Sequence, residues 1–223
     1  MFCVPVLVFS QKIHVIVALC DNQNQGIAPV NSMLGNGQNA SSNLYWGARY
    51  GFKTWFKNSD WTLIEEIKNP SPYVLERVSF IKNGSEMMAE AYDGAYIKNA
   101  IEDFITECYS DQYDLVVYLG HNGLMEFELK PELIPSPRPP DVVIISCLSK
   151  PYFEPLIKPS GANPLVWTSA VVAPESYTLD YILNAWLLKK SNEEILQSAI
   201  TGYCKYQKCD VSIGKTIFVT GYD

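Results

Sequence analysis

Two residues that follow apolar segments of this chain could carry nucleophilic chemistry. The segment 115–120 (LVVYLG) runs directly into His121, and the segment 142–145 (VVII) runs into Ser146 and Cys147. A histidine beside a cysteine favours the thiolate, which is the form of the side chain that attacks a carbonyl carbon. We therefore predict that Cys147 is a nucleophile and that His121 handles its proton.

Backbone amides beside these residues could complete such a site. Gly123 lets the backbone approach a developing oxyanion, and the amides of Asn122, Gly123 and Cys147 are the predicted donors. A structural interpretation stays open at this point. A cysteine at the end of a buried strand is commonly a packed core residue, and a histidine in a turn commonly serves only that turn.

The positions of His121 and Cys147 depend on a sheet of parallel strands. Short, continuous apolar runs predict buried strands, and apolar residues three and four apart predict helices. The predicted strands are 13–20, 73–81, 115–120, 142–147 and 165–172; the predicted helices are 43–57, 93–108 with Asp93 as N-cap, 179–187, and one that starts at a capping box of Ser191 and Glu194. This alternation predicts an α/β fold with a mostly parallel, doubly wound sheet and a site at the carboxyl ends of its strands.

Composition limits the classes of function. The chain has 223 residues, 48% of them hydrophobic, and a net charge of −7 without a run of Lys or Arg. This predicts one α/β domain over residues 12–223, with the proline-rich stretch 131–140 as a loop inside it. A nucleic-acid partner is not expected, because phosphate binding needs clustered basic residues. With only two histidines, a histidine-rich metal site is not expected either, and we predict no cofactor.

Residues 1–11 form an apolar run that ends at Ser10 and Gln11. The run is too short for stable insertion in a membrane, but it would suit the end of a secretory signal peptide. In that case the protein is exported; if the run is instead an edge strand or an apolar terminus, the protein is cytoplasmic. Cys204 and Cys209 could pair in an exported protein, although unpaired thiols are our default expectation.

Residues after other strands are candidates for a substrate pocket. Asp21 and Asn22 follow the first strand, where Asp21 could select a basic side chain. The alternative for both is ordinary turn chemistry. Trp167, Thr168 and Ser169 lie near the end of the strand that follows Cys147 and could form a pocket wall, although Trp167 also suits the core.

The order of these elements resembles a known family. An apolar strand, then His121 and a nearby glycine, then a second apolar strand that ends in Ser146 and Cys147, looks like the signature of the caspase-like cysteine peptidases, the clan of caspases, legumains and gingipains. The gingipain-like branch is most similar, because its histidine and cysteine are also closely spaced. The resemblance implies a three-layer α/β/α sandwich in which Cys147 is the nucleophile and His121 the general base or acid.

The chain departs from the family pattern at two positions. Asn122 stands where a glycine usually follows the histidine, and Ser146 replaces the commoner Ala or Gly before the cysteine. Two hypotheses follow. The chain is a cysteine peptidase, or a related acyl-transfer enzyme, that acts on a peptide or protein. Alternatively it is a non-catalytic binding or structural domain of the same fold, in which Asn122 marks a lost oxyanion site. The sequence leaves the oligomeric state open.

Overall fold

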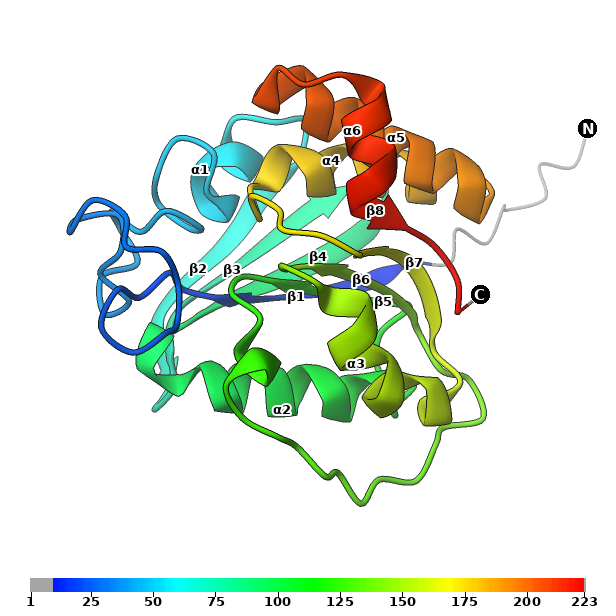
Figure 1. The fold of residues 1–223 in the computed structure, drawn as a ribbon, viewed down its shortest axis with the longest axis horizontal. Coiled ribbons are helices and arrows are strands. Elements are labelled where there is room, and N and C mark those ends of the chain that lie inside the picture. Colours follow the sequence, from blue (N-terminus) through cyan, green and yellow to red (C-terminus); the bar gives the residue numbers. More distant parts are fainter. Residues whose placement is uncertain (1–9, 223) are drawn as a thin grey trace, which may run out of the picture.

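The computed structural model describes residues 10–222, in which a single sheet lies between two layers of helices (Figure 1). Most of the predicted signal-peptide segment 1–11 therefore lies outside the described residues. The strands are β1 (Lys12–Ala18), β2 (Thr62–Ser71), β3 (Val74–Lys82), β4 (Ser85–Tyr92), β5 (Leu115–Leu119), β6 (Asp141–Ile145), β7 (Asn163–Thr168) and β8 (Phe218–Val219). The α-helices are α1 (Phe52–Lys57), α2 (Ile97–Cys108), α3 (Ser149–Ile157), α4 (Ser176–Leu187), α5 (Asn192–Gln207) and α6 (Val211–Ile217).

The sheet has eight strands in the order β2-β3-β4-β1-β5-β6-β7-β8. The five strands from β4 to β7 are parallel to their neighbours, whereas β2, β3 and β8 add antiparallel pairs at the two edges. Helices α1, α4, α5 and α6 cover one face, and α2 and α3 cover the other (Figure 1). The predicted α/β class and the mostly parallel sheet are confirmed.

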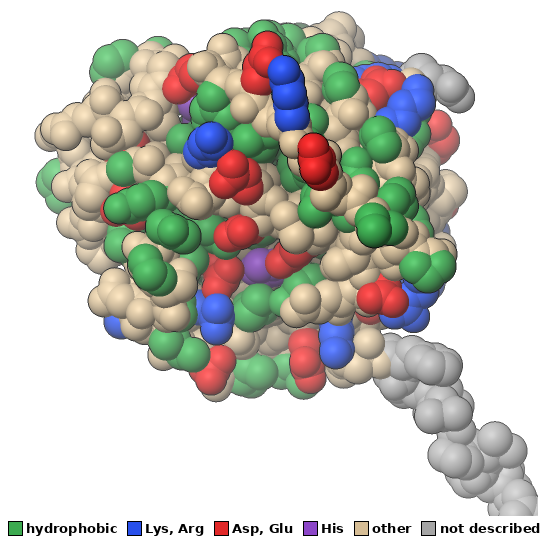
Figure 2. All heavy atoms as spheres, turned by 90° about the horizontal axis from the view of Figure 1, so that it is seen from below, with side chains coloured by type: hydrophobic (Ala, Val, Ile, Leu, Met, Phe, Trp, Pro, Cys, Tyr) green, Lys and Arg blue, Asp and Glu red, His purple; other side chains and the backbone are tan. Residues whose placement is uncertain are grey.

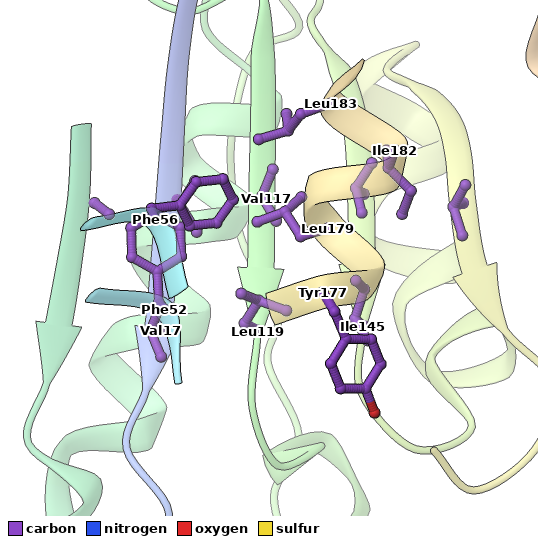
Figure 3. Packing of buried hydrophobic residues seen from close by; sticks show 14 of the residues in the cluster. Val17, Phe52, Phe56, Val117, Leu119, Ile145, Tyr177, Leu179, Ile182 and Leu183 are labelled. Carbon is purple, nitrogen blue, oxygen red and sulfur yellow. The ribbon is translucent and has the colours of Figure 1, made fainter. Parts of the chain in front are cut away.

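Alternate residues of the central strands enter two separate cores, as expected for strands covered on both faces. On β1, Val15 and Val17 pack into the core beneath α1 and α4, whereas Ile16 packs into the core above α2 and α3. Figure 3 shows the first of these cores, with Phe52 and Phe56 of α1 beside Val17. Burial on both faces explains why these strands read as continuous apolar runs in the sequence.

The predicted helix 43–57 is wrong over most of its length, because only α1 is helical in this stretch. Asn43 is fully buried, and its side chain binds both backbone groups of Cys20, accepting from the amide (3.1 Å) and donating to the carbonyl (2.8 Å). These bonds satisfy the backbone just beyond β1, much as another strand would. The segment before α1 is therefore a loop anchored to the end of β1.

The segment 165–172, predicted as a strand, ends as one at Thr168, and the segment 142–147 ends at Ile145. Strands β2, β4 and β8 and helices α3 and α6 were not predicted. Helix α2 begins at Ile97 and is preceded by a single 3₁₀ turn, Gly94–Tyr96. The Asp93 side chain is the N-cap of this turn, as predicted. The capping box of Ser191 and Glu194 at the start of α5 is also confirmed.

Charged side chains of both signs are interspersed on the face that is seen from below in Figure 2. Among residues 10–222, no helix combines the length and the apolar character needed to cross a membrane.

Candidate active site

His121 and Cys147 occupy equivalent positions on two neighbouring strands. β5 and β6 are parallel neighbours, and their last paired residues are Leu119 and Ile145. His121 and Cys147 each come two residues after this pair, at the carboxyl edge of the sheet. Since the ends of parallel neighbours open on the same edge, the topology brings the two predicted residues to one place. An arrangement in which the two strands are not neighbours is excluded.

The His121 side chain is held by a glutamate that the sequence analysis did not single out. The imidazole Nε2 lies 2.5 Å from Oε1 of Glu126, which also accepts the amide of Gly26 at 2.7 Å. The Tyr118 hydroxyl donates to the His121 carbonyl at 2.7 Å and so fixes the backbone of the same residue. A carboxylate that accepts from Nε2 sets the tautomer and leaves Nδ1 free to accept a proton.

Cys147 lies in the turn that connects β6 to α3. Its thiol is partly buried and contacts Val172, accepting from the amide (3.4 Å) and donating to the carbonyl (3.6 Å). Leu148 next to it has φ of 52°, a left-handed conformation that costs a bulky residue about 1–2 kcal/mol. Such backbone outliers persist only where the surroundings determine them, and they gather at functional sites.

Hydrogen bonds below this turn account for its shape. The Thr168 hydroxyl donates to the Ser146 carbonyl and accepts the amide of Ser149 at 3.0 Å. All three residues are buried. Thr168, which we predicted as a pocket residue, therefore supports the turn that carries Cys147 from beneath.

Asn122 joins the two halves of the site. Its side chain is fully buried, and its Nδ2 donates to the Cys147 carbonyl at 2.8 Å and approaches the Leu148 carbonyl at 3.5 Å. Its Oδ1 is buried without a partner among the described residues. The residue that departs from the family pattern is thus a direct link between the histidine loop and the cysteine turn.

The predicted oxyanion hole is partly occupied by internal bonds. The Gly123 amide donates to the His121 carbonyl at 3.2 Å. A Cβ at Gly123 would lie only 2.8 Å from the Phe127 ring, so a larger residue at this position would require that ring to shift. The assignment of the Asn122, Gly123 and Cys147 amides as oxyanion donors stays a prediction.

Asp21 and Asn22 organise the loop after β1. The carboxylate of Asp21 is buried and accepts the amides of Gln23 (2.9 Å) and Asn24 (3.3 Å), together with side-chain amides of Asn24 and Gln38 (2.8 Å each). Burial alone would raise the pKa of Asp21, but these hydrogen bonds outweigh it and lower the pKa. Asn22 binds both backbone groups of Val30. This bonding is typical of the turn chemistry that we kept as the alternative.

Trp167 and Ser169 make their contacts away from the Cys147 thiol. Trp167 is fully buried in the core beside α3 and packs edge-on against Tyr222. The Ser169 hydroxyl donates to the carbonyl of Thr216 in α6 at 3.0 Å. These contacts do not support a role for Trp167 or Ser169 in a substrate pocket. That role stays a prediction for both residues.

Two further residues of this region, Tyr45 and Glu126, were not singled out from the sequence. Tyr45 is buried in the loop before α1 and belongs to the core cluster against which Cys147 packs. Burial raises the pKa of Tyr45 far above its ordinary value, and the side chains of Cys20, Cys147 and Glu175 add to that effect. Glu126 could have been noticed as an acid a few residues after His121, whereas nothing in the sequence connects Tyr45 with the site.

The imidazole and the thiol share no hydrogen bond in the part of the chain that the structure describes. His121 binds Glu126, and Cys147 binds Val172. Catalytic hydrogen bonds are often long in a substrate-free protein and tighten when substrate binds. The predicted nucleophile, the predicted base and an acid bound to that base therefore all lie at one edge of the sheet, and the thiol is bonded to the β7–α4 loop.

Comparison of the chain with protein-family models, with curated proteins and with solved structures gives no match.

Proposed function

We propose that this protein is a cysteine peptidase, or a related acyl-transfer enzyme, built on a caspase-like α/β/α sandwich. The observation that carries the proposal is the matched placement of His121 and Cys147, each two residues beyond the paired ends of β5 and β6. The Glu126 carboxylate on the imidazole adds the third member of a nucleophile, base and orienting acid. A peptide or protein is the substrate that such a set of groups serves.

In the proposed reaction the Cys147 sulfur attacks the carbonyl carbon of a peptide bond. His121 Nδ1 takes the thiol proton as the sulfur–carbon bond forms, and it then gives the proton to the leaving amine as the carbon–nitrogen bond breaks. Water attacks the resulting thioester, with His121 again as base, and restores the free thiol. Glu126 stabilises the imidazolium that exists between these transfers.

The reaction requires one local change. The Cys147 thiol must leave the Val172 carbonyl, to which it donates at 3.6 Å. A contact of this length to sulfur is weak, so breaking it when substrate binds costs little free energy. The buried Asn122 bridge keeps the backbone of the turn in place while the side chain rotates.

Labelling with an electrophilic peptide tests the proposal. A library of peptidyl vinyl sulfones is incubated with the protein, and adducts are located by peptide mass spectrometry. We expect an adduct on Cys147 that disappears in Cys147→Ala and persists in Cys209→Ala, which removes the other partly exposed thiol among residues 10–222. Equal labelling of wild type and Cys147→Ala would overturn the proposal, provided that circular dichroism shows both to be folded.

The non-catalytic domain is the second candidate, and one observation favours it. The Cys147 thiol is bonded to Val172 instead of His121. On this account the thiol has ordinary reactivity, and no member of the library labels Cys147 although the protein is folded. Peptide binding without labelling, measured by fluorescence anisotropy, would support this candidate over the enzyme.

A further inference from the structure

A second pair of cysteines lies close together at the end of α5. The sulfur atoms of Cys204 and Cys209 are 2.9 Å apart, and both residues are free thiols. Lys208 adopts a left-handed conformation (φ 54°) that ends the helix and turns the chain back, and the Cys209 amide donates to the Cys204 carbonyl at 3.1 Å. The backbone thus brings the two thiols into contact without any change of the fold.

The two thiols differ in accessibility. Cys204 is 6% exposed, contacts the Asp210 carbonyl at 3.3 Å and packs against α6 at Gly214, where a Cβ would lie 2.8 Å from the sulfur. Cys209 is partly exposed. Burial raises the pKa of Cys204 to about 11, and the hydrogen bond with Cys209 adds to this effect. Cys209 is therefore the thiol that meets a reagent first.

No other pair among the five described cysteines has its sulfur atoms in hydrogen-bond contact. Cys20 is buried in the loop after β1, Cys108 is buried at the end of α2, and Cys147 binds Val172. Reversible disulfides form between thiols that need no backbone movement to meet and of which one is exposed to the oxidant. Within residues 10–222, only Cys204 and Cys209 meet both conditions.

We propose that Cys204 and Cys209 are a redox modification site, at which a small disulfide such as oxidised glutathione converts the two thiols to an intramolecular disulfide. This site is independent of the proposed peptidase activity, because neither cysteine belongs to the candidate active site.

The chemistry balances as a thiol–disulfide exchange. The Cys209 thiolate attacks one sulfur of oxidised glutathione, which breaks the glutathione disulfide and releases one glutathione thiolate. The Cys204 sulfur then attacks the Cys209 sulfur of the mixed disulfide and releases the second glutathione. The protein loses two electrons and two protons, and oxidised glutathione is reduced to two molecules of glutathione.

The disulfide would join the last turn of α5 to the short connection that precedes α6. The position of α6 also depends on Ser169, which bonds the Thr216 carbonyl, and on Asp210, which caps the helix. Since the closed loop contains only the residues from 204 to 209, the gain in thermal stability on oxidation is expected to be small. A fixed α5–α6 corner is the structural consequence.

Trypsin digestion gives a direct test, because Lys205 and Lys208 lie between the two cysteines. Full-length protein is equilibrated with glutathione and oxidised glutathione at a series of ratios, treated with N-ethylmaleimide, digested and analysed by mass spectrometry. We expect peptides 191–205 and 209–215 to appear linked by a disulfide as the share of oxidised glutathione rises, and to separate again in excess reduced glutathione.

Two variants make the test specific. Cys147→Ser should form the linked peptides as wild type does, whereas Cys204→Ser should stop at a mixed disulfide of Cys209 with glutathione. Absence of the 204–209 link at every ratio, or a preferred link from Cys209 to Cys147, would overturn the proposal. Labelling of Cys147 by peptide electrophiles is measured on the same samples, so that failure of either proposal is seen separately.

Discussion

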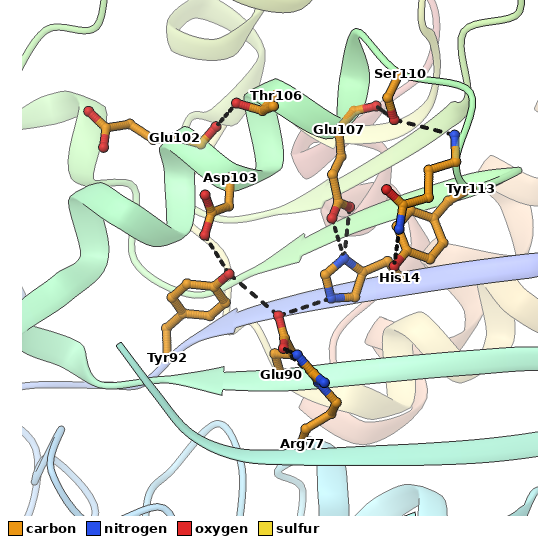
Figure 4. A network of polar contacts seen from close by, with 11 residues as sticks. His14, Arg77, Glu90, Tyr92, Glu102, Asp103, Thr106, Glu107, Ser110 and Tyr113 are labelled. Atoms are coloured by element: carbon orange, nitrogen blue, oxygen red, sulfur yellow. Dashed lines mark hydrogen bonds and ion pairs between the residues drawn. The ribbon is translucent and has the colours of Figure 1, made fainter. Parts of the chain in front are cut away.

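The two histidines of this protein are both bound by glutamates but lie in different surroundings. His14, on β1, is 2% exposed, and its Nδ1 lies 2.7 Å from Glu107 while its Nε2 lies 3.4 Å from Glu90 (Figure 4). Arg77 pairs with the same Glu90 at 2.6 Å. His121 is 9% exposed and has one glutamate partner, whose side chain is 35% exposed.

The difference distinguishes a buried ion network around His14 from the proposed reactive site around His121. Burial would lower the pKa of His14, but the hydrogen bonds and charges of Glu107 and Glu90 outweigh it and raise the pKa to about 9. His14 is therefore charged at neutral pH, with acidic partners on both sides of its ring, and has no position left for a substrate. His121 has one ring nitrogen beside an acid and the other without a hydrogen-bond partner in the described residues.

The same substitution at both histidines should produce the largest difference. His14→Ala leaves Glu90 and Glu107 facing each other in a buried network, so we expect the free energy of unfolding to fall by about 3–5 kcal/mol. His121→Ala should cost about 1 kcal/mol, because Glu126 can rely on water. Urea denaturation at neutral pH measures both losses, and equal losses would contradict the distinction.

The charge on His14 also predicts how stability depends on pH. Its folded pKa, about 9, lies above the ordinary 6.5, so the folded state binds the proton more tightly. The stabilisation is complete below the unfolded pKa and is lost as pH rises through the folded value, a fall of about 3 kcal/mol in the free energy of unfolding.

Urea titrations across this range, on wild type and His14→Gln, measure the effect. The decline should be present in wild type and much flatter in the variant. A wild-type protein that becomes more stable as pH rises from neutral would contradict the charged network.

A smaller effect is expected at the link between the two halves of the candidate site. Asn122→Ala removes the bond to the Cys147 carbonyl but leaves no unpaired charge, so we expect a loss of about 1–2 kcal/mol in the free energy of unfolding. A loss as large as that of His14→Ala would mean that the candidate site is also primarily a stabilising network. The matched control is Asn39→Ala, in the exposed part of the loop before α1.

The sequence predicts those strands and helices whose buried residues follow a regular spacing within the element itself. The central strands are buried on both faces, and α2 presents Ile97, Ile101 and Phe104 at helical spacing. Strand β4 was missed because its sequence, SEMMAEAY, is rich in helix formers and becomes a strand through its pairing with β1 and β3. Strand β2 is a largely exposed edge strand with no apolar alternation to detect.

The candidate site was predictable only where it depends on the strands. The strand ends place His121 and Cys147, but the partners of these residues come from elsewhere in the chain. Val172 contacts the thiol from the β7–α4 loop, and Gly26, in the loop after β1, donates its amide to the Glu126 carboxylate that holds His121. Such contacts depend on how loops fold over the sheet edge, which no local pattern encodes.

The pH dependence of alkylation at Cys147 tests the central claim most directly. Wild type, His121→Ala and Glu126→Gln are treated with iodoacetamide at a series of pH values, and the rate at each cysteine is read by peptide mass spectrometry. We predict that Cys147 reacts fastest of the six cysteines near about pH 6, that His121→Ala removes this advantage, and that Glu126→Gln reduces it about 10-fold. If Cys147 reacts no faster than Cys209 and is indifferent to both substitutions, the pair does not function as a nucleophile and its base.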